Sequence, residues 1–179
     1  MTVGHLTPAR MRVPLVAACG ALMLLAGCAT GPGANPRDPW EPMNRQVFAF
    51  NEAFDEVAFK PVAVAYKTVT PRLVRAGVTN FFNNLGDAWS LFNNVLQGKL
   101  QGSVETYFRL TVNTIWGIGG VFDIATEIGV EPHPEDFGQT LGLWGLPTGP
   151  YLVLPFFGPS NVRDALATPA DTFGYPVTL

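Results

Sequence analysis

Residues 71–98, PRLVRAGVTNFFNNLGDAWSLFNNVLQG, indicate a helical fold. Pro71 suits a first helical turn, and the apolar residues that follow recur at a spacing that places them on one side of a helix. These apolar residues are Val74, Val78, Phe81, Phe82 and Leu85. We expect Gly86 to stop this helix, Asp87 to cap a second helix and Gly98 to end it. The stretch therefore predicts two consecutive amphipathic helices.

Helical patterns continue on both sides of this stretch. Asp38, Pro39 and Glu41 have the spacing of a capped helix start, and an apolar stripe follows them at helical spacing. Pro61 is expected to end or kink that helix. Residues 101–116 again carry apolar side chains at helical spacing. We therefore expect the first half of the exported chain to be entirely helical.

Residues 117–159 differ in character, because they contain nine Gly and six Pro. Their aromatic and aliphatic content argues against disorder, and long loops inside compact domains are usually functional when they are ordered. We expect an ordered, glycine-hinged segment with a short helix at 123–129 and a strand pair near 139–154. Ser160 is expected to cap a last helix.

The N-terminus has the pattern of an export signal. Two arginines precede an apolar run at 13–27 that is short for a bilayer span. The run ends in LAGC (25–28), which resembles the bacterial lipobox, where the Cys thiol is acylated and Cys becomes the first residue after cleavage. An ordinary secretory signal, with Cys28 incidental, is the less favoured alternative. The sequence thus predicts a signal peptide at 1–27 and a lipidated Cys with its tether at 28–38.

The composition favours a lipid partner over nucleic acid. Only 14% of residues are charged and 47% are apolar, whereas soluble domains average about 25% charged residues. A sequence pI of 5.3 without a basic stripe argues against nucleic acid. Beyond the signal there is no run of 18 apolar residues, so we expect no spanning helix, and a seat within one leaflet fits better. Loss of two arginines with the signal leaves an acidic body, which predicts no electrostatic attraction to anionic lipid.

The sequence does not assemble a catalytic or metal site. His133 is the one histidine beyond the signal, and acylation of Cys28 leaves no free thiol, so Ser-His-Asp and Cys-His arrangements are not favoured. His133 lies in the acidic segment 131–136, where two prolines separate the candidate ligands. This pattern favours a solvated acidic loop over a cation site. We expect a protein that is not an enzyme and has no cofactor or metal.

Asparagine is frequent in the stretches expected to be helical, although its helix propensity is low. The residues concerned are Asn44, Asn51, Asn80, Asn83, Asn84, Asn93, Asn94 and Asn113. One explanation is that several of them cap helices. The other is that neutral amides pair helices or line a wet passage in an apolar setting, where charges are more costly. The sequence does not separate the two.

Five segments in order resemble the MlaA/VacJ family of outer-membrane lipoproteins. They are DPWEPMNRQVFAFNEAFD (38–55), KPVAVAYKTVTPRLVRAGVTNFFNNLGD (60–87), NNVLQGK (93–99), RLTVNTIWGIGGVFDIA (109–125) and EDFGQTLGLWGLPTGPYLVLPFFGPSNVRDA (135–165). The resemblance covers nearly all of 38–179. Family members usually continue beyond the position matching Tyr175, so residues 39–179 resemble a family domain that is incomplete at its C-terminal side.

This resemblance implies an all-α, ring-like, monotopic domain embedded in the periplasm-facing leaflet of the bacterial outer membrane, with an amphipathic channel and a Gly/Pro-rich lid or hairpin. It implies removal of mislocalised phospholipid from the outer leaflet and its transfer to the periplasmic carrier MlaC. Association with trimeric porins is also implied. Ala29, directly after Cys28, favours the outer membrane by the same resemblance.

The resemblance also suggests roles for individual residues. Cys28 is the expected lipid anchor. Channel candidates are Phe48, Phe50 and Asn51; hinge candidates are Gly117, Gly119, Gly120 and Phe122; lid candidates are Asp136, Phe137, Gly138, Gly142 and Gly145. A structural lipoprotein that scaffolds porins or the cell surface is the alternative function. A tethered periplasmic hydrolase is disfavoured, because the catalytic constellation is missing.

Overall fold

The computed structural model describes Asn35 and residues 38–175. The expected signal peptide, Cys28 and most of the tether lie outside the described residues. The elements in chain order are α2 (Glu41–Phe54), the π-helix η2 (Asp55–Phe59), α3 (Lys60–Val69), α4 (Arg72–Leu96), α5 (Leu100–Ile115), α6 (Ile124–Glu127), α7 (Phe137–Leu143), β1 (Tyr151–Leu154), β2 (Gly158–Asn161) and α8 (Val162–Gly174). The expectation of a mostly helical chain is confirmed.

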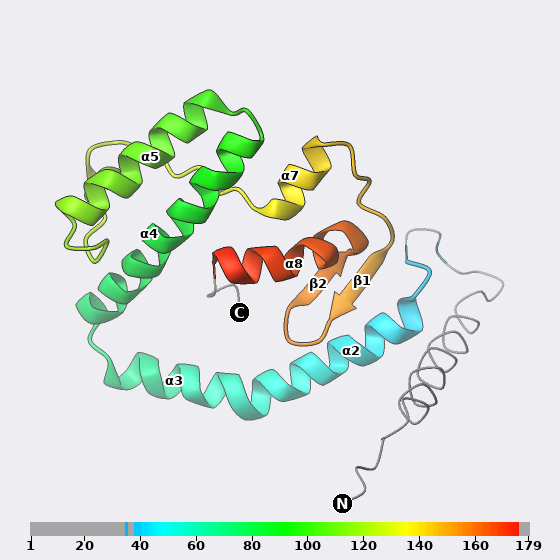
Figure 1. Ribbon diagram of the computed structural model, residues 1–179. Helices are drawn as coiled ribbons and strands as arrows, with labels where there is room; N and C mark the ends of the chain where they lie inside the picture. Colours follow the sequence, from blue (N-terminus) through cyan, green and yellow to red (C-terminus); the bar gives the residue numbers. More distant parts are fainter. Residues whose placement is uncertain (1–34, 36–37, 176–179) are drawn as a thin grey trace, which may run out of the picture.

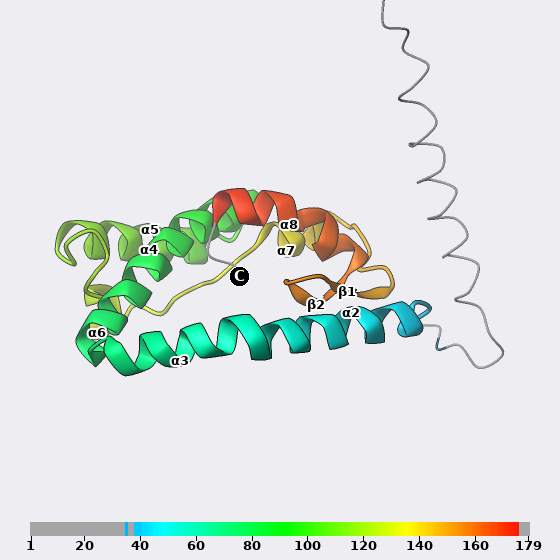
Figure 2. The same cartoon turned by 90° about the horizontal axis from the view of Figure 1, so that it is seen from below.

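The elements trace an open ring (Figure 1). α2, η2 and α3 form one long curved arm, α4 turns back from its end, and α5 packs beside α4. The antiparallel hairpin β1–β2, with Tyr151 opposite Asn161, lies between α2 and α8 and brings the chain back to its start. Figure 2 shows the ring edge-on as a flat body, with the arm on one side and α4, α5, α7 and α8 on the other.

The arm differs from expectation at both ends of its first helix. α2 begins at Glu41 with Trp40 at its N-cap and without a side-chain cap, so the capping role given to Asp38 was wrong. The Asp38 carboxylate instead accepts a hydrogen bond from Asn44 Nδ2 at 2.7 Å. Pro61 does not end the helix, because η2 inserts one π-type turn and Pro61 falls in the first turn of α3, where its missing N–H is tolerated.

Residues 71–98 form one helix rather than two. α4 continues through Gly86, whose Cα faces the Tyr175 ring so closely that a Cβ would lie 3.3 Å from it. Asp87 is buried within the helix and pairs with Arg109 on α5. These tertiary contacts outweigh the cost of about 1 kcal/mol for a helical glycine. The predicted end is confirmed, since Gly98 adopts φ +69° just after the helix.

The glycine-rich half is partly as predicted. α6 confirms the short helix expected at 123–129, but residues 137–143 form α7, so the strand pair lies later in the chain than expected. The last helix is capped by Asn161, whose side chain accepts from the Asp164 N–H, while Ser160 lies in β2. Short aliphatic runs do not distinguish a buried strand from a buried helical turn by periodicity alone, which explains the misplacement.

The described residues have little apolar core. The buried hydrophobic residues are Val112, Ala125, Val153 and Ala167. The buried polar or charged residues are Asn44, Asn84, Asp87, Ser90, Asn93, Asn94, Thr106, Arg109, Asn113 and Thr140. Across the part of the chain that the structure describes, no helix is both long and apolar enough to cross a membrane. The interior is therefore held together mainly by hydrogen bonds and ion pairs.

Candidate functional site

Many large apolar side chains are exposed at the surface. Leu73 is 87% exposed, Val57 82% and Val69 81%, and the phenylalanines of α2 are about half exposed. Soluble proteins usually bury such residues and expose polar ones. Here most of the buried side chains are polar and many large apolar side chains are exposed, so the distribution is inverted.

Arg109 is the centre of the polar interior. Its side chain is 4% exposed, and its Nε and Nη2 atoms lie 3.4 Å from Asp87 Oδ2 and 3.2 Å from Asp123 Oδ1. Nη1 donates to Thr126 Oγ1 at 3.1 Å and to the Val130 carbonyl. One cation thus joins α4, α5, α6 and the loop after α6. Removal of one partner from such a buried network leaves an uncompensated charge.

The two carboxylates around Arg109 differ in their electrostatics. Burial raises the pKa of Asp87 above its ordinary 3.8, and this effect exceeds the opposing influence of Arg109. Burial also acts to raise the pKa of Asp123. There, hydrogen bonds from Thr126 and Asn113, together with the Arg109 charge, outweigh it and lower the pKa. In this network burial disfavours the ionised form of Asp87, whereas hydrogen bonds and the Arg109 charge favour the ionised form of Asp123.

The asparagines bridge elements rather than cap helices. Asn93 Oδ1 accepts from Thr140 on α7 at 2.8 Å, and Asn94 Nδ2 donates to the His133 carbonyl at 3.1 Å. Asn113 holds the start of α6 by donating to Asp123 and accepting from the Ala125 N–H. None of the eight asparagines named from the sequence caps one of the described helices. The capping explanation was therefore wrong, and the amides act as pairing groups.

The acidic loop around His133 is docked on α4 and α5. His133 Nε2 contacts the Glu105 carboxylate, and Lys99 Nζ pairs with Glu135 Oε1 at 2.6 Å. Hydrogen bonds from Gln101 and from His133 lower the pKa of Glu105. Within the described ranges no group of three or more His, Cys, Asp or Glu is arranged to hold a metal ion.

A cavity of about 530 Å³, lined by both polar and apolar residues, lies beside α4. Trp89 stands at its edge and donates from Nε1 to Asp171 Oδ1 at 2.8 Å, the same oxygen that accepts from the Phe137 N–H. The other lining residues include Asp87, Ser90, Arg109, Asp123, Glu135, Gln139 and Tyr175. The cavity thus joins the Arg109 network to α7 and α8.

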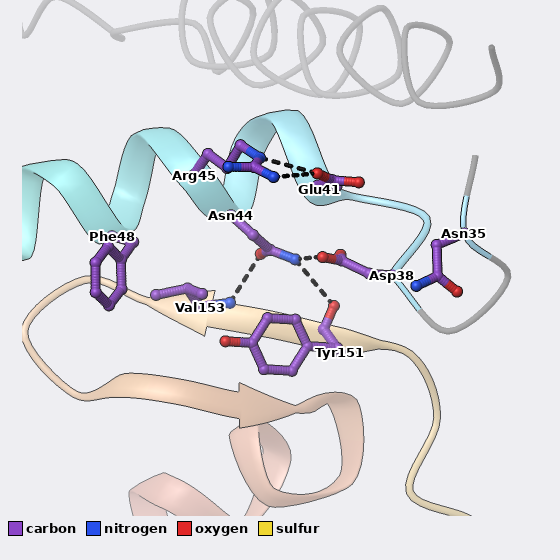
Figure 3. Close-up of a pocket in the computed structure, with 8 residues that line it drawn as sticks. All are labelled: Asn35, Asp38, Glu41, Asn44, Arg45, Phe48, Tyr151 and Val153. Carbon is purple, nitrogen blue, oxygen red and sulfur yellow. Dashed lines mark hydrogen bonds and ion pairs between the residues drawn. The ribbon is translucent and has the colours of Figure 1, made fainter. Parts of the chain in front are cut away.

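The contact between α2 and β1, here called the hairpin seam, includes two hydrogen bonds of the Asn44 side chain (Figure 3). Asn44 Oδ1 accepts from the Val153 N–H at 2.8 Å, and Asn44 Nδ2 donates to the Tyr151 carbonyl at 3.3 Å. Phe48, one turn further along α2, lines a second cavity of about 460 Å³ together with Tyr151. This amide was not assigned a site role from the sequence, where it was only one of eight asparagines.

The other two channel candidates also contact the hairpin. Asn51 Nδ2 donates to the Leu154 carbonyl and its Oδ1 accepts from the Phe156 N–H, both at 2.9 Å. Phe50 meets the Phe156 ring edge to face at a centroid distance of 5.5 Å. Phe156 has φ +67°, in the left-handed region that a non-glycine residue rarely adopts. Phe50 and Asn51 thus contact a strained hairpin tip, whereas Phe48 lies beside β1.

The hinge candidates form a tight turn after α5. Gly119 has φ +68° with open space where a Cβ would be, whereas Gly120 has φ +92° and its Cβ would lie 2.5 Å from Asn84 Cβ. A Cβ on Gly117 would clash with the Phe122 carbonyl. Phe122 itself is about half exposed. Gly117 is required by a close contact, Gly119 by its positive φ and Gly120 by both. Of the three, only Gly119 has open space where a Cβ would be.

The lid candidates belong to α7 and its ends. Asp136 caps α7 by accepting from the Gln139 N–H at 2.6 Å. Gly138 and Gly142 face Asp164 and Arg163 on α8 so closely that any Cβ would collide with them. The remaining candidates lie at the two ends of the helix: Phe137 begins it and meets the Trp144 ring edge to face, and Gly145 has φ +94° just after it. α7 is thus packed on α8 and is not an isolated loop.

The sequence analysis did not predict the ion-pair network around Arg109, because it gave the two carboxylates other roles. Asp87 was assigned to a helix cap, and Asp123 was only the first residue of the short helix expected at 123–129. One signal was available: Arg109 is the one cation in 101–116 and stands between Phe108 and Leu110, and a cation that is buried with apolar neighbours needs an acidic partner. Periodicity does not show which carboxylate supplies it.

Comparison with known proteins places the chain in a family. The profile of the MlaA lipoprotein family matches residues 36–179. An uncharacterised protein of Rickettsia prowazekii is 41% identical over 127 residues, 71% of this chain and 51% of that protein. The Escherichia coli intermembrane phospholipid transport system lipoprotein MlaA is 38% identical over 173 residues, 93% of this chain and 68% of that protein.

A solved structure described as the structural basis for maintenance of bacterial outer membrane lipid asymmetry is also similar. It superposes with a TM-score of 0.67 at 36% identity, over 76% of this chain and 70% of that one. The chain spans about half the length of the Rickettsia relatives it matches. Because the family profile covers most of the chain and the sequence identity to a named member is high, the chain belongs to the MlaA lipoprotein family.

Proposed function

We propose that this chain is a non-enzymatic lipoprotein of the outer membrane that removes mislocalised phospholipid from the outer leaflet. In this proposal Cys28 anchors the ring in the periplasm-facing leaflet, and the lipid passes through the polar interior to a periplasmic carrier of the MlaC type. Association with trimeric porins belongs to the same proposal. The family and the name of the Escherichia coli relative, which refers to intermembrane phospholipid transport, support it.

The inverted distribution of side chains is the observation that carries the proposal. Apolar residues on the outside suit acyl chains, because exposing them to water is unfavourable by about 25 cal/mol per Å². Buried asparagines, threonines and the Arg109 network suit an interior that a polar head group enters. A phospholipid that leaves its leaflet needs both surfaces at once.

The residues that we propose to line the route lie at the hairpin seam and in the cavity beside α4. Phe48, Phe50 and Asn51 border the hairpin, where the two aromatic rings contact the tails and Asn51 holds the hairpin backbone. Trp89 and Ser90 border the cavity beside α4. We assign the tails to the first group and the head group to the second.

The proposed lid is a larger unit than a loop. Gly138 and Gly142 are in close contact with α8, so α7 moves only together with α8 and the hairpin. The hinge then lies outside this unit, and Gly119, which has a positive φ and open space where a Cβ would be, is the freest of the three hinge glycines to change conformation.

The test is expression of the full chain in a bacterium that lacks its own family member, with phospholipid on the cell surface measured by its accessibility to an added phospholipase. The proposal expects wild type to lower surface phospholipid. The Cys28→Ala variant is expected to fail, because one signal for membrane attachment is lost. Wild type that leaves surface phospholipid unchanged, and carries no glycerolipid when purified, favours the scaffolding alternative.

The hinge is tested by Gly119→Ala against Gly129→Ala. Both glycines have positive φ and nothing within 4 Å of a Cβ, so both variants carry similar backbone strain. Only Gly119→Ala is expected to slow removal of surface phospholipid. Equal activity of the two variants refutes the hinge and leaves the rest of the proposal standing.

A further inference from the structure

The cations of this acidic protein are unevenly placed. Residues 57–86 contain Lys60, Lys67, Arg72 and Arg75 and not one Asp or Glu. This stretch covers α3 and the first half of α4, including the turn between them. Net charge alone therefore hides a basic region at one corner of the ring (Figure 1).

These four cations also differ from the other described cations in their ion pairs. Among the described residues, the other cations are each in an ion pair with an acid: Arg45, Lys99, Arg109 and Arg163. No ion pair with a described residue is formed by the four cations of 57–86. The Nε atom of Arg75 is buried and has no hydrogen-bond partner in the described part of the chain. Lys60, Lys67 and Arg72 are exposed and Arg75 is half-buried, so these cations can meet an external anion.

One of the four is partly balanced by a neighbour. Lys60 and Glu56 border the same shallow groove, so the charge of Lys60 is offset locally. We therefore define the basic corner as Lys67, Arg72 and Arg75. Between these cations stand Val69 and Leu73, which are 81% and 87% exposed.

We propose that the basic corner docks on anionic phospholipid head groups of the membrane surface. Its cations attract phosphate, while Val69 and Leu73 insert among the acyl chains, the combination that characterises interfacial helices. An acidic protein surface is the weaker match, because it would leave the two most exposed aliphatic side chains of the corner without apolar contact. The inference rests on the proposed membrane seat and adds a preference for lipid charge.

The experiment compares binding of the lipidated full chain to vesicles of phosphatidylcholine alone and to vesicles that also contain phosphatidylglycerol. The acyl chains on Cys28 contribute equally to both, so the ratio of the two affinities isolates the head-group charge. Each Lys or Arg near an anionic surface contributes about fivefold. Wild type is expected to prefer the anionic vesicles, and Lys67→Gln/Arg72→Gln is expected to lower the ratio by about 25-fold.

The matched control is Arg45→Gln/Lys99→Gln, which removes the same net charge from exposed ion pairs elsewhere. It is expected to keep the wild-type ratio, and high salt is expected to abolish the preference of both proteins. An equal fall in both double variants, or no preference in wild type, overturns the proposal. A corner that instead binds an acidic protein shows the same lack of lipid preference. Either result leaves the surface-phospholipid assay of the proposed function unaffected.

Discussion

The arm and the body of the ring are held in different ways. In the body, α4 and α5 bury a charged network around Arg109, and α4 buries four further polar residues, Asn84, Ser90, Asn93 and Asn94. In the arm, α2 buries Asn44, and η2 and α3 bury no residue. The body is thus tied by its own interior, whereas the arm is held to the ring at the hairpin seam and at its junction with α4.

This difference teaches where the surroundings must contribute to stability. Helices in water gain most of their stability from packing an apolar face. The arm exposes its apolar residues instead, so contacts outside the described residues must supply this stability. Under the proposed function these contacts are with acyl chains. The body is expected to survive changes of lipid or detergent that loosen the arm.

The largest predicted effect breaks the body. Arg109→Met removes the cation shared by Asp87 and Asp123 and leaves two carboxylates in a polar but enclosed setting. Loss of one partner of a buried ion pair costs about 3–5 kcal/mol. Denaturant unfolding in mild detergent, followed by circular dichroism, measures the loss.

The control for this variant is Arg45→Gln in the arm. Arg45 pairs with Glu41 at 2.6 Å, but its side chain is 78% exposed. Exposed pairs contribute about 0–1 kcal/mol, so we expect a small change at most. A similar loss in both variants would mean that the body is not the more strongly tied half.

Gly120→Ala is predicted to be the next most destabilising change. Its φ of +92° and a Cβ 2.5 Å from Asn84 Cβ combine backbone strain with overlap, together about 2–4 kcal/mol. Gly119→Ala, one residue earlier, has the strain without the overlap, about 1–2 kcal/mol. Thermal unfolding of the two variants separates the terms. Equal midpoints would show that the turn relaxes away from Asn84.

The sequence predicts much of the fold because helical periodicity and glycine ends are local signals. The helix over 101–116, the stop at Gly98 and the short helix after Asp123 all follow from neighbours in the chain. The errors came from distant contacts. Gly86 is a poor helix residue locally, but packing against Tyr175 and the Arg109 pair of its neighbour keeps the helix intact.

The sequence identified some residues of the candidate site but not the residues that they contact. Asn51 and Phe50 were singled out, and both contact the hairpin. Their partners are about 100 residues further along the chain, beyond the reach of any local pattern. The same holds for Asn44, because nothing in its neighbourhood in the sequence distinguishes it from an asparagine exposed on a helix.

Two asparagine variants loosen the arm while sparing the body. Asn44→Ala leaves the buried Val153 N–H without its acceptor, which costs about 1–3 kcal/mol. Asn51→Ala frees groups nearer to solvent, at about 1 kcal/mol. Hydrogen exchange is expected to rise in β1 and β2, more for the first variant, with α4 and α5 unchanged. Faster exchange in α5 would contradict the division into two parts.

The smallest predicted effect is a pH dependence that divides the body itself. Asp87 has a raised pKa, so its contribution to stability is present below pH 3.8 and lost as the pH rises through the folded value. Asp123 has a lowered pKa, so its contribution is present above 3.8 and lost as the pH falls through its folded value. Relative to wild type, Asp87→Asn is therefore expected to gain stability as the pH rises, and Asp123→Asn to lose it. Unfolding midpoints from about pH 3 to about pH 6 measure both differences. Both residues contact the same guanidinium. If the stability differences of the two variants from wild type change with pH in the same direction, the two carboxylates titrate as one unit, and burial does not distinguish them.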